Sequence, residues 1–299
     1  MSGAPRIDAR RIGDLLRGDG RAFSFEFFPP KDEAGEEVLW RSISELEPLD
    51  PTFVSVTYGA GGTTRDRTLA ITARIAQETS LLPMAHLTCV GHTTAELERI
   101  LGALVTSGVH NVLALRGDPP NGPGTDWVPT EGGVDYASEL VALVRRTADL
   151  SIGVAAFPEG HRDAASVEDD VAVLRAKQDA GAEFAVTEMV LRASDYLGLV
   201  ERAQAAGVDM PIIPGIMPIL GIGSMTKMVE LSGRDMPAEV LARILPHEGD
   251  AAAVRAEGMA IATELCDDLL AAGSPGLHFY TLNRSKATRE IWSALSLSA

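Results

Sequence analysis

Phe23-Ser24-Phe25-Glu26-Phe27-Phe28 is followed directly by Pro29-Pro30 in this chain of 299 residues. In an extended strand successive side chains point to opposite faces, so the alternate phenylalanines share one face while Ser24 and Glu26 share the other. The two prolines lack the N–H group that a sheet needs, and they end the strand. Glu26 therefore lies near the carboxyl end of a strand, which is where parallel α/β folds place their active sites.

Short stretches that favour strands alternate with longer amphipathic stretches along the whole chain, which is typical of a repeated βα unit. The expected strands are residues 22–27, 52–57, 84–89, 111–116, 151–156, 184–188, 211–215 and 277–280. The expected helices include residues 38–46, 65–77, 95–107, 137–146, 167–180, 194–206 and 254–272. Eight such units in a chain of this length predict an α/β fold of the (β/α)8 TIM-barrel type, with residues 1–299 as one catalytic domain.

Two further elements are expected. The first 20 residues, which include Arg10, Arg11, Leu15 and Leu16, predict a short leading helix, and the long gap before the last strand has room for an extra helix. An open doubly wound sheet is the alternative fold. It is disfavoured because no G-x-G-x-x-G turn follows the first strand, and Gly221-Ile222-Gly223 comes too late in the chain.

Composition excludes several classes of function. The formal net charge of −16 argues against nucleic acid as a partner, because phosphate neutralisation needs a basic surface. No apolar run reaches the roughly 20 residues needed to cross a bilayer, and the first residues do not resemble a signal peptide, so we expect a cytoplasmic protein without a membrane partner. Cys89 and Cys266 are too few for a zinc or disulfide framework and are expected to be core thiols. The pattern requires no metal, and it is compatible with a homo-oligomer.

Polar residues recur at the predicted strand ends, on the parity that should face the barrel interior. They are Ser24, Glu26, Ser55, Thr57, His86, Thr88, Arg116, Asp118, Glu188, His278 and Tyr280. Barrel interiors are normally apolar, so this set predicts a ligand site. Ser55, Thr88 and His278 are interpreted as structural, while His86 is left open between a structural and a functional role. The glycine-rich loop 59–64 is either a turn or a place where a ligand approaches the backbone.

Glu26 and Asp118 are two separated carboxylates that can divide acid and base roles between them. The phenylalanines of the same strand predict an apolar setting that raises the pKa of Glu26. On this interpretation Glu26 is a protonated donor and Asp118 an ionised partner for a ligand N–H group.

Five motifs occur in order along the chain and together identify a resemblance. They are Phe25-Glu26-Phe27-Phe28-Pro29-Pro30-Lys31, Phe53-Val54-Ser55-Val56-Thr57-Tyr58-Gly59-Ala60, His86-Leu87-Thr88-Cys89, Leu115-Arg116-Gly117-Asp118-Pro119-Pro120 and His278-Phe279-Tyr280-Thr281-Leu282-Asn283-Arg284. From about residue 20 to the C-terminus the chain resembles bacterial methylenetetrahydrofolate reductases. The resemblance implies a barrel in which NADH or NADPH reduces FAD, and the flavin reduces a folate-bound methylene group to methyl for methionine synthesis.

The resemblance also implies roles for individual residues. Glu26 would protonate the folate N10, and Asp118 would hydrogen-bond the pterin beside the flavin. The implied FAD-contacting residues are Thr57, His86, Arg116, Gly117, Asp118, Tyr136, Ala137, Phe157, His161, Asp170 and Lys177. The implied folate-side residues are Glu26, Asp118, Glu188, Ser224, Met228, Tyr280 and Arg284. Among these, Lys177 and His161 would face a pyrophosphate, and Arg284 would pair with the folate glutamate tail.

Several positions depart from the family pattern. Thr187-Glu188-Met189-Val190 stands where the better-known bacterial enzymes carry Thr-Gln-Phe-Phe, so an amide becomes a carboxylate that only accepts hydrogen bonds when ionised. If Glu188 and Glu26 face one ligand, each raises the pKa of the other. Other substitutions are Phe157, Val173 and Ala176 near the implied flavin, and Ser224 and Met228 on the implied nicotinamide and folate surface.

These departures leave alternatives to the leading interpretation. One is a family member without flavin that transfers hydride directly from the nicotinamide to folate. Another is a barrel lyase that uses Glu26 and Asp118 without a redox step, although neither Lys31 nor Lys177 is expected to point from a strand into the barrel. A third is a folate- or flavin-binding protein without turnover.

Overall fold

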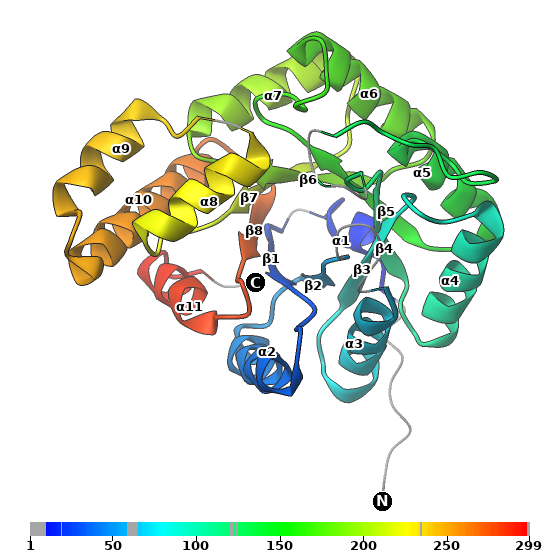
Figure 1. The fold of residues 1–299 in the computed structure, drawn as a ribbon, viewed down its shortest axis with the longest axis horizontal. Helices are drawn as coiled ribbons and strands as arrows, with labels where there is room; N and C mark the ends of the chain where they lie inside the picture. The colour runs from blue at the N-terminus through cyan, green and yellow to red at the C-terminus, as the bar shows by residue number, and fades with distance from the viewer. Residues whose placement is uncertain are drawn as a thin grey trace, which may run out of the picture.

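The structure is a computed structural model that describes residues 10–18, 20–58, 65–119, 122, 125–233 and 235–297. Eight parallel strands close into a barrel in sequence order, and helices surround it, as Figure 1 shows. The strands are β1 Ala22–Phe27, β2 Phe53–Val56, β3 Pro83–Thr88, β4 Asn111–Leu115, β5 Ser151–Ala156, β6 Phe184–Met189, β7 Ile212–Ile216 and β8 Gly276–Tyr280. The predicted (β/α)8 barrel is confirmed, and each predicted strand is placed to within one residue.

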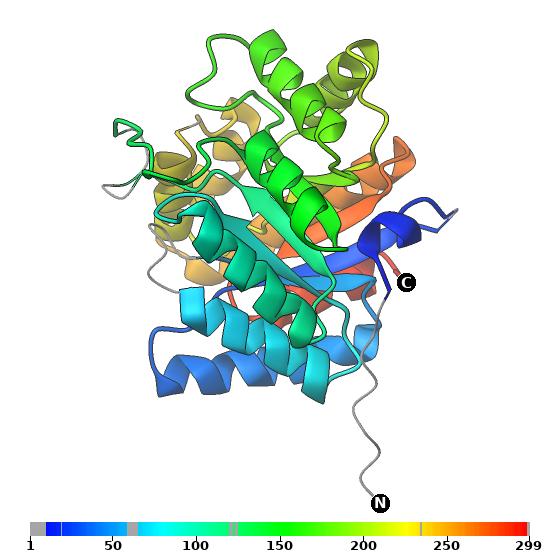
Figure 2. The same cartoon turned by 90° about the vertical axis from the view of Figure 1, so that its right-hand side faces the viewer.

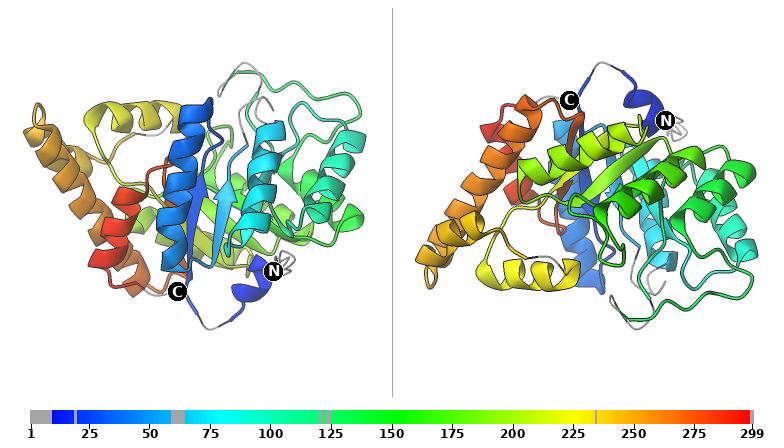
Figure 3. Two further views of the ribbon diagram at one scale, coloured as in Figure 1. Left: turned by 90° about the horizontal axis from the view of Figure 1, so that it is seen from below. Right: turned by 90° about the horizontal axis from the view of Figure 1, so that it is seen from above.

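The helices that follow the strands pack around the barrel (Figures 1 and 3). They are α2 Glu33–Leu46, α3 Arg65–Glu78, α4 Thr94–Thr106, α5 Ala137–Thr147, α6 Val167–Asp179, α7 Ala193–Ala205, α10 Ala251–Ala271 and α11 Ser285–Ala294. Two short 3-10 segments, Glu47–Leu49 and Leu245–His247, follow α2 and α9 Ala238–Ile244. Helix α2 begins five residues before the predicted start at 38, because the Asp32 side chain caps it by accepting from Gly35 N.

Besides α10, the gap before β8 holds two helices, α8 Ile222–Ser232 and α9, where one extra helix was expected. These helices form a small apolar cluster with the start of α10, separate from the barrel core. The cluster contains Ile219, Met225, Val240, Ile244 and Val254. The segment that carries the implied residues Ser224 and Met228 is therefore packed largely on its own apolar residues rather than on the strands.

The inside of the barrel is divided into an apolar end and a polar end. At the amino ends of the strands, buried apolar side chains fill the interior. They include Phe53, Met84, Leu113, Phe184, Val186 and Ile213. Closer to the carboxyl ends of the strands, the buried side chains are polar. They include Ser24, Glu26, Ser55, His86 and His278. The expectation of a polar interior therefore holds at the carboxyl end, while the opposite end is a normal apolar barrel core.

The short leading helix that was expected is a single turn, α1 Ile12–Leu15. It closes the amino end of the barrel, and Figure 2 shows it opposite the long loop that follows β4. Ile12 N donates to Asn111 Oδ1 at 2.8 Å and Gly13 N donates to Ser151 Oγ at 2.9 Å. The backbone N–H groups at the start of this short helix are thus paired with buried side chains of β4 and β5.

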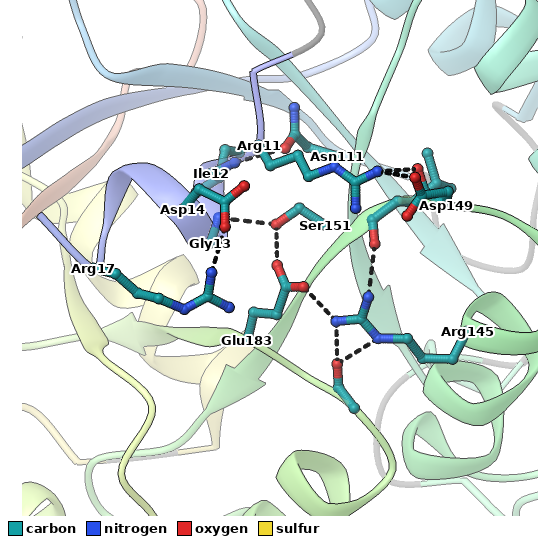
Figure 4. Close-up of polar contacts among 12 residues, drawn as sticks. Arg11, Ile12, Gly13, Asp14, Arg17, Asn111, Arg145, Asp149, Ser151 and Glu183 are labelled. Atoms are coloured by element: carbon teal, nitrogen blue, oxygen red, sulfur yellow. Dashed lines mark hydrogen bonds and ion pairs between the residues drawn. The ribbon is translucent and has the colours of Figure 1, made fainter.

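A polar network extends this plug into the barrel wall (Figure 4). Ser151 Oγ donates to Glu183 Oε2 at 2.5 Å, and Arg145 Nη2 lies 2.5 Å from Glu183 Oε1. Gly13 leaves the space that Glu183 occupies, because an added Cβ would collide with that carboxylate. The network ties the N-terminal segment to the end of the barrel that is remote from the strand mouths.

Two further expectations can be compared with the structure. Cys89 and Cys266 are both buried free thiols, which confirms their assignment to the core. Within the described ranges, no helix combines the length and apolar character that crossing a bilayer requires.

Candidate active site

Glu26 is buried at the end of β1 and is the centre of a polar cluster, with an exposed fraction of 5%. Its Oε2 atom lies 3.1 Å from His278 Nε2, 3.3 Å from His86 Nε2 and 3.3 Å from Ser55 Oγ, which donates to it. His278 comes from β8 and Ser55 from β2, the two strands that flank β1. One carboxylate oxygen is therefore hydrogen-bonded to side chains of the two flanking strands, and His86 of β3 lies within ion-pair distance of it.

Ser24 fixes the second ring nitrogen of His278. Ser24 Oγ lies 2.7 Å from His278 Nδ1, and the imidazole stacks on the Phe53 ring with 5.9 Å between centroids. When His278 Nε2 carries the proton that it donates to Glu26, Nδ1 accepts from the Ser24 hydroxyl. Ser24, His278 and Glu26 thus form a chain along which a proton can be held at more than one atom.

The pKa of Glu26 is lowered rather than raised. Burial by itself raises it, but the charge of His86 and the hydrogen bond from His278 outweigh burial and lower the pKa of Glu26 to about 2. The prediction of a raised pKa was wrong because the phenylalanines point outward. Phe25, for example, packs against Trp292 with 5.5 Å between ring centroids. Glu26 is instead surrounded by His86 and His278, which point into the barrel with it.

Asp118 has no hydrogen bond or ion pair with the Glu26 cluster. It is exposed in the segment after β4, directly after Gly117. Gly117 has φ +86°, and an added Cβ would lie 2.5 Å from Val90 Cγ1 and 2.9 Å from Thr88 Cβ. Glycine is therefore required at this turn. Its neighbours Arg116 and Asp118 follow β4 at the carboxyl end of the strand, which we call the mouth of the barrel. The contacts of Glu26 go to His86, His278 and Ser55 instead of Asp118.

A second group of side chains, which we call the basic cluster, consists of Arg116, His161 and Lys177. Arg116 Nη2 lies 2.8 Å from Asp163 Oδ2, and its guanidinium is 5.0 Å from the centre of the Trp127 ring. His161 packs edge-on against Phe157 with 4.7 Å between centroids. Lys177 is buried on α6, where Nζ donates to Ala155 O at 2.9 Å. The cluster therefore sits where β4 and β5 end.

Burial and mutual repulsion change the titration of this cluster. Burial lowers the pKa of Lys177 to about 8, against the attraction of Asp170, and Arg116 lowers it further. Burial also lowers the pKa of His161, with a further contribution from the charge of Arg116. Cations held together in this way gain from an anion placed among them.

The remaining residues implied at the flavin site have varied positions. Thr57 is half-buried just beyond β2, and its N–H donates to Phe27 O at 2.9 Å. Tyr136 is exposed before α5, whose first residue, Ala137, is buried. Asp170 is buried in the first turn of α6. The glycine-rich loop 59–64 and Pro120 lie outside the described residues.

The residues implied on the folate side are only partly brought together. Tyr280 OH donates to Thr187 O at 2.7 Å, which places its ring between β8 and β6. Burial raises the pKa of Tyr280, and the charges of Glu26 and then Glu188 add to the effect. Tyr280 therefore links Glu26 to the end of β6, where Glu188 is exposed.

The other three folate-side residues come from two separate segments, α8 and the residue before α11, and have no hydrogen bond or ion pair with Glu26. Ser224 is exposed near the start of α8, where its hydroxyl donates to Gly221 O, and Met228 is half-buried on the same helix. Arg284 is exposed immediately before α11. Their place on the folate side therefore stays a prediction.

Sequence reasoning missed several members of the site. Ser55 and His278 were interpreted as structural, yet both contact Glu26 directly, and Asp163 and Trp127 beside Arg116 were not singled out. The signal for His278 was available, because Ser24, Glu26 and His278 share the inward parity of adjacent strands. The contact of Asp163 depends on loop conformation, which no periodicity encodes.

The described residues contain no group of three or more His, Cys, Asp or Glu side chains arranged to hold a metal ion. Thr88 Oγ1 and Trp127 Nε1 are buried without a hydrogen-bond partner at the same end of the barrel as the basic cluster. Buried polar atoms of this kind are rare in folded proteins and are common where a ligand or water completes a site.

Comparison with known proteins identifies the family of this chain. Residues 11–296 match the family model described as "Methylenetetrahydrofolate reductase". The chain is 38% identical over 274 residues to the Escherichia coli 5,10-methylenetetrahydrofolate reductase, covering 92% of this chain and 90% of the relative. It is 39% identical over 298 residues to methylenetetrahydrofolate reductase (NADH) 1 of Arabidopsis thaliana, covering 96% of this chain and 50% of the relative.

The chain spans about half the length of the plant and fission-yeast relatives that it matches. Among solved structures, an uncharacterised Clostridium thermocellum protein that binds two copies of 5-methyl-5,6,7,8-tetrahydrofolic acid has a TM-score of 0.67. It covers 94% of this chain and 97% of its own at 14% identity, so it is evidence for the shared fold alone. By the extent of the family match and of the bacterial alignment, the chain belongs to the methylenetetrahydrofolate reductase family.

Proposed function

We propose that this protein reduces 5,10-methylenetetrahydrofolate to 5-methyltetrahydrofolate, with NADH or NADPH as hydride source and FAD as carrier. The product would supply methyl groups for methionine synthesis in the cytoplasm, and the chain would act as a single catalytic domain. The observation that carries the proposal is the buried Glu26 carboxylate in a chain of this family. One oxygen of this carboxylate lies within 3.3 Å of His278 Nε2, His86 Nε2 and Ser55 Oγ.

Glu26 would act as the proton donor to the folate N10. Protonation of N10 opens the five-membered ring and leaves the methylene carbon as an iminium, which accepts a hydride. In the free protein the lowered pKa of Glu26 means that the carboxylate is ionised. A bound pterin that covers the cluster would further desolvate the carboxylate and raise its pKa, so that Glu26 can take up the proton that it donates.

Asp118 and Tyr280 would bind and orient the folate. Asp118 is an exposed acceptor at the end of β4, suited to the N–H groups of a pterin. The Tyr280 ring is held in place by the 2.7 Å hydrogen bond from its hydroxyl to Thr187 O. Both flank the mouth of the barrel at which Glu26 lies, so a pterin bound there would present N10 to the buried carboxylate.

The basic cluster fits the diphosphate of a dinucleotide. Arg116, His161 and Lys177 come from three segments of the chain, and the charge of Arg116 reaches both of the other groups. Near this cluster, Trp127 Nε1 and Thr88 Oγ1 are buried donors that have no hydrogen-bond partner among the described residues. FAD bound at this end of the barrel would supply the hydride relay between the nicotinamide and the methylene carbon.

A family member without flavin is the second candidate, and two observations favour it. The ammonium group of Lys177 is already bonded to Ala155 O, and the adjacent face of α6 presents Val173, which is 49% exposed, and the exposed Ala176. Neither of these side chains offers a hydrogen bond to a phosphate.

One experiment tests the activity and separates the two routes. The purified protein, with and without added FAD, is incubated with methylenetetrahydrofolate and NADH deuterated at the transferred position. Formation of methyltetrahydrofolate supports the proposed activity. Flavin absorbance together with label lost to solvent supports the FAD route, since a reduced flavin exchanges its N–H hydrogen with water, whereas label retained in the methyl group of a colourless protein supports direct transfer. Folate binding without any reduction would contradict the proposed activity.

A further inference from the structure

Arg116 is held by two neighbours at the end of β4. Its guanidinium lies 5.0 Å from the centre of the Trp127 ring, and Nη2 lies 2.8 Å from Asp163 Oδ2. The side chains of Arg116 and Asp163 are 25% and 49% exposed, so an anion arriving from solvent can reach this ion pair. Arg116 is thus the member of the basic cluster that is both accessible and already neutralised.

Asp163 is fixed by the loop that follows β5. Its N–H donates to His161 Nδ1 at 3.1 Å, and its carboxylate lies 3.9 Å from the same nitrogen. His161 is in turn packed against Phe157. The loop therefore carries a diphosphate donor, His161, and an acidic competitor, Asp163, in one short segment.

Carboxylates oppose the cations of this site in the free protein. Arg116 and Lys177 are opposed by Asp163 and Asp170, whose charges act on the groups of the basic cluster. Burial lowers the pKa of His161. Arg162 lies against Gly233 at the end of α8, and its charge also acts on Asp163. A diphosphate would therefore meet carboxylates as well as cations in this site.

We propose that Asp163 limits the affinity of the nucleotide site, because it competes with the ligand diphosphate for Arg116. This inference rests on the proposed function, since it takes the basic cluster to be the diphosphate site. Binding of the nucleotide exchanges the carboxylate of Asp163 for a phosphate on the guanidinium and leaves that carboxylate beside an anion. Asp163 is accordingly an affinity-determining residue that keeps the nucleotide exchangeable.

The test compares Asp163→Asn with Asp169→Asn. Asp169 lies in the first turn of α6 and is exposed, so its replacement makes the same change in net charge without touching Arg116. Affinities for ADP, FAD and NADH are measured by calorimetry for the wild type and both variants. We expect Asp163→Asn to tighten binding of each probe by about threefold to tenfold, and Asp169→Asn to change it less than twofold.

A double variant locates the effect. In the Arg116→Ala background, Asp163→Asn should lose most of its gain, because the residue for which it competes is absent. Equal affinities for Asp163→Asn and the wild type, or weaker binding in Asp163→Asn, would overturn the inference, and the second result would make Asp163 a residue that positions Arg116. Failure of the wild type to bind any of the three probes would instead reject the nucleotide site of the proposed function.

Discussion

His278 Nε2 lies 3.1 Å from Glu26 Oε2, and both side chains are buried where β8 and β1 run side by side. The same oxygen is 3.3 Å from His86 Nε2, so one carboxylate oxygen has two imidazoles beside it. This arrangement keeps an ionised carboxylate inside the barrel, because burial of a charge is costly unless donors surround it.

The lowered pKa of Glu26 predicts a specific loss of stability in acid. The folded-state pKa is about 2 and the ordinary value is 4.5, so the stabilisation is fully present above pH 4.5 and is lost as the pH falls towards about 2. The share of Glu26 is on the order of 3 kcal/mol, from about 1.4 kcal/mol per unit of pKa. Glu26→Gln should therefore show a shallower loss of unfolding free energy with falling pH in urea titrations.

Glu98→Gln is the matched control for that experiment, because Glu98 is exposed on α4 and its replacement removes a charge at the surface. Its acid dependence should follow that of the wild type. If Glu26→Gln also lost stability in parallel with the wild type, the histidines would not be lowering the pKa of Glu26.

Lys177 predicts a pH dependence of nucleotide binding. Its pKa is lowered to about 8 by burial, so the ammonium is charged below that pH and neutral above it. Affinity for ADP should fall as the pH rises through about 8, since an attractive charge is lost. The Lys177→Met variant should bind more weakly at neutral pH and should lack this fall. A wild-type affinity that is flat across this range would show that Lys177 does not face the ligand.

Gly117→Ala should destabilise the protein and disturb the segment that holds Arg116 and Asp118. Two costs add at this position: Gly117 has a φ of +86°, and an added Cβ would collide with Val90 and Thr88. Gly91→Ala is the control, because Gly91 has φ +72° and an added Cβ would have no neighbour within 4 Å. We expect Gly117→Ala to cost about 1–3 kcal/mol more than Gly91→Ala in chemical denaturation. Equal costs would mean that the neighbours of Gly117 yield freely.

Ser151→Ala tests the separation between the stabilising and reactive ends of the barrel. Ser151 is fully buried, accepts from Gly13 N and donates to Glu183, as Figure 4 shows. Its removal leaves a buried N–H group unpaired, at a cost of about 1–3 kcal/mol. Thermal unfolding should occur at a lower temperature while kcat/KM stays at the wild-type value. A large loss of kcat/KM in folded protein would show that the plug influences the strand mouths.

The sequence predicted the strands well because their signals are local. Phe23 to Phe28 before two prolines, and apolar runs such as Val112 to Leu115, define a strand without reference to the rest of the chain. Helix α2 was predicted to start late because its beginning depends on the Asp32 cap rather than on apolar periodicity. The sequence did not distinguish α8 and α9 as two helices, because they pack on a small apolar cluster of their own.

The candidate site was predictable in its membership more than in its chemistry. Glu26 and Asp118 follow from strand ends and from the family resemblance, and the inward parity of His86 and His278 is visible in the sequence. The pKa of Glu26 was predicted in the wrong direction, because the outcome depends on which side chains of neighbouring strands approach within about 3 Å. That distance is set by the register of the closed barrel, such as the pairing of Glu26 with Ser55 and Tyr280.

The most direct test of the central claim compares methyltetrahydrofolate formation by the wild type and by Glu26→Gln, with methylenetetrahydrofolate and NADH or NADPH as substrates. Folate binding is measured for both proteins so that a loss of turnover is not confused with a loss of affinity. We expect the wild type to form the methyl product and Glu26→Gln to form it at least about 100-fold more slowly with folate still bound, because the proton donor to N10 is gone. Turnover by Glu26→Gln at the wild-type rate, or no methyl product from the wild type, would contradict the account.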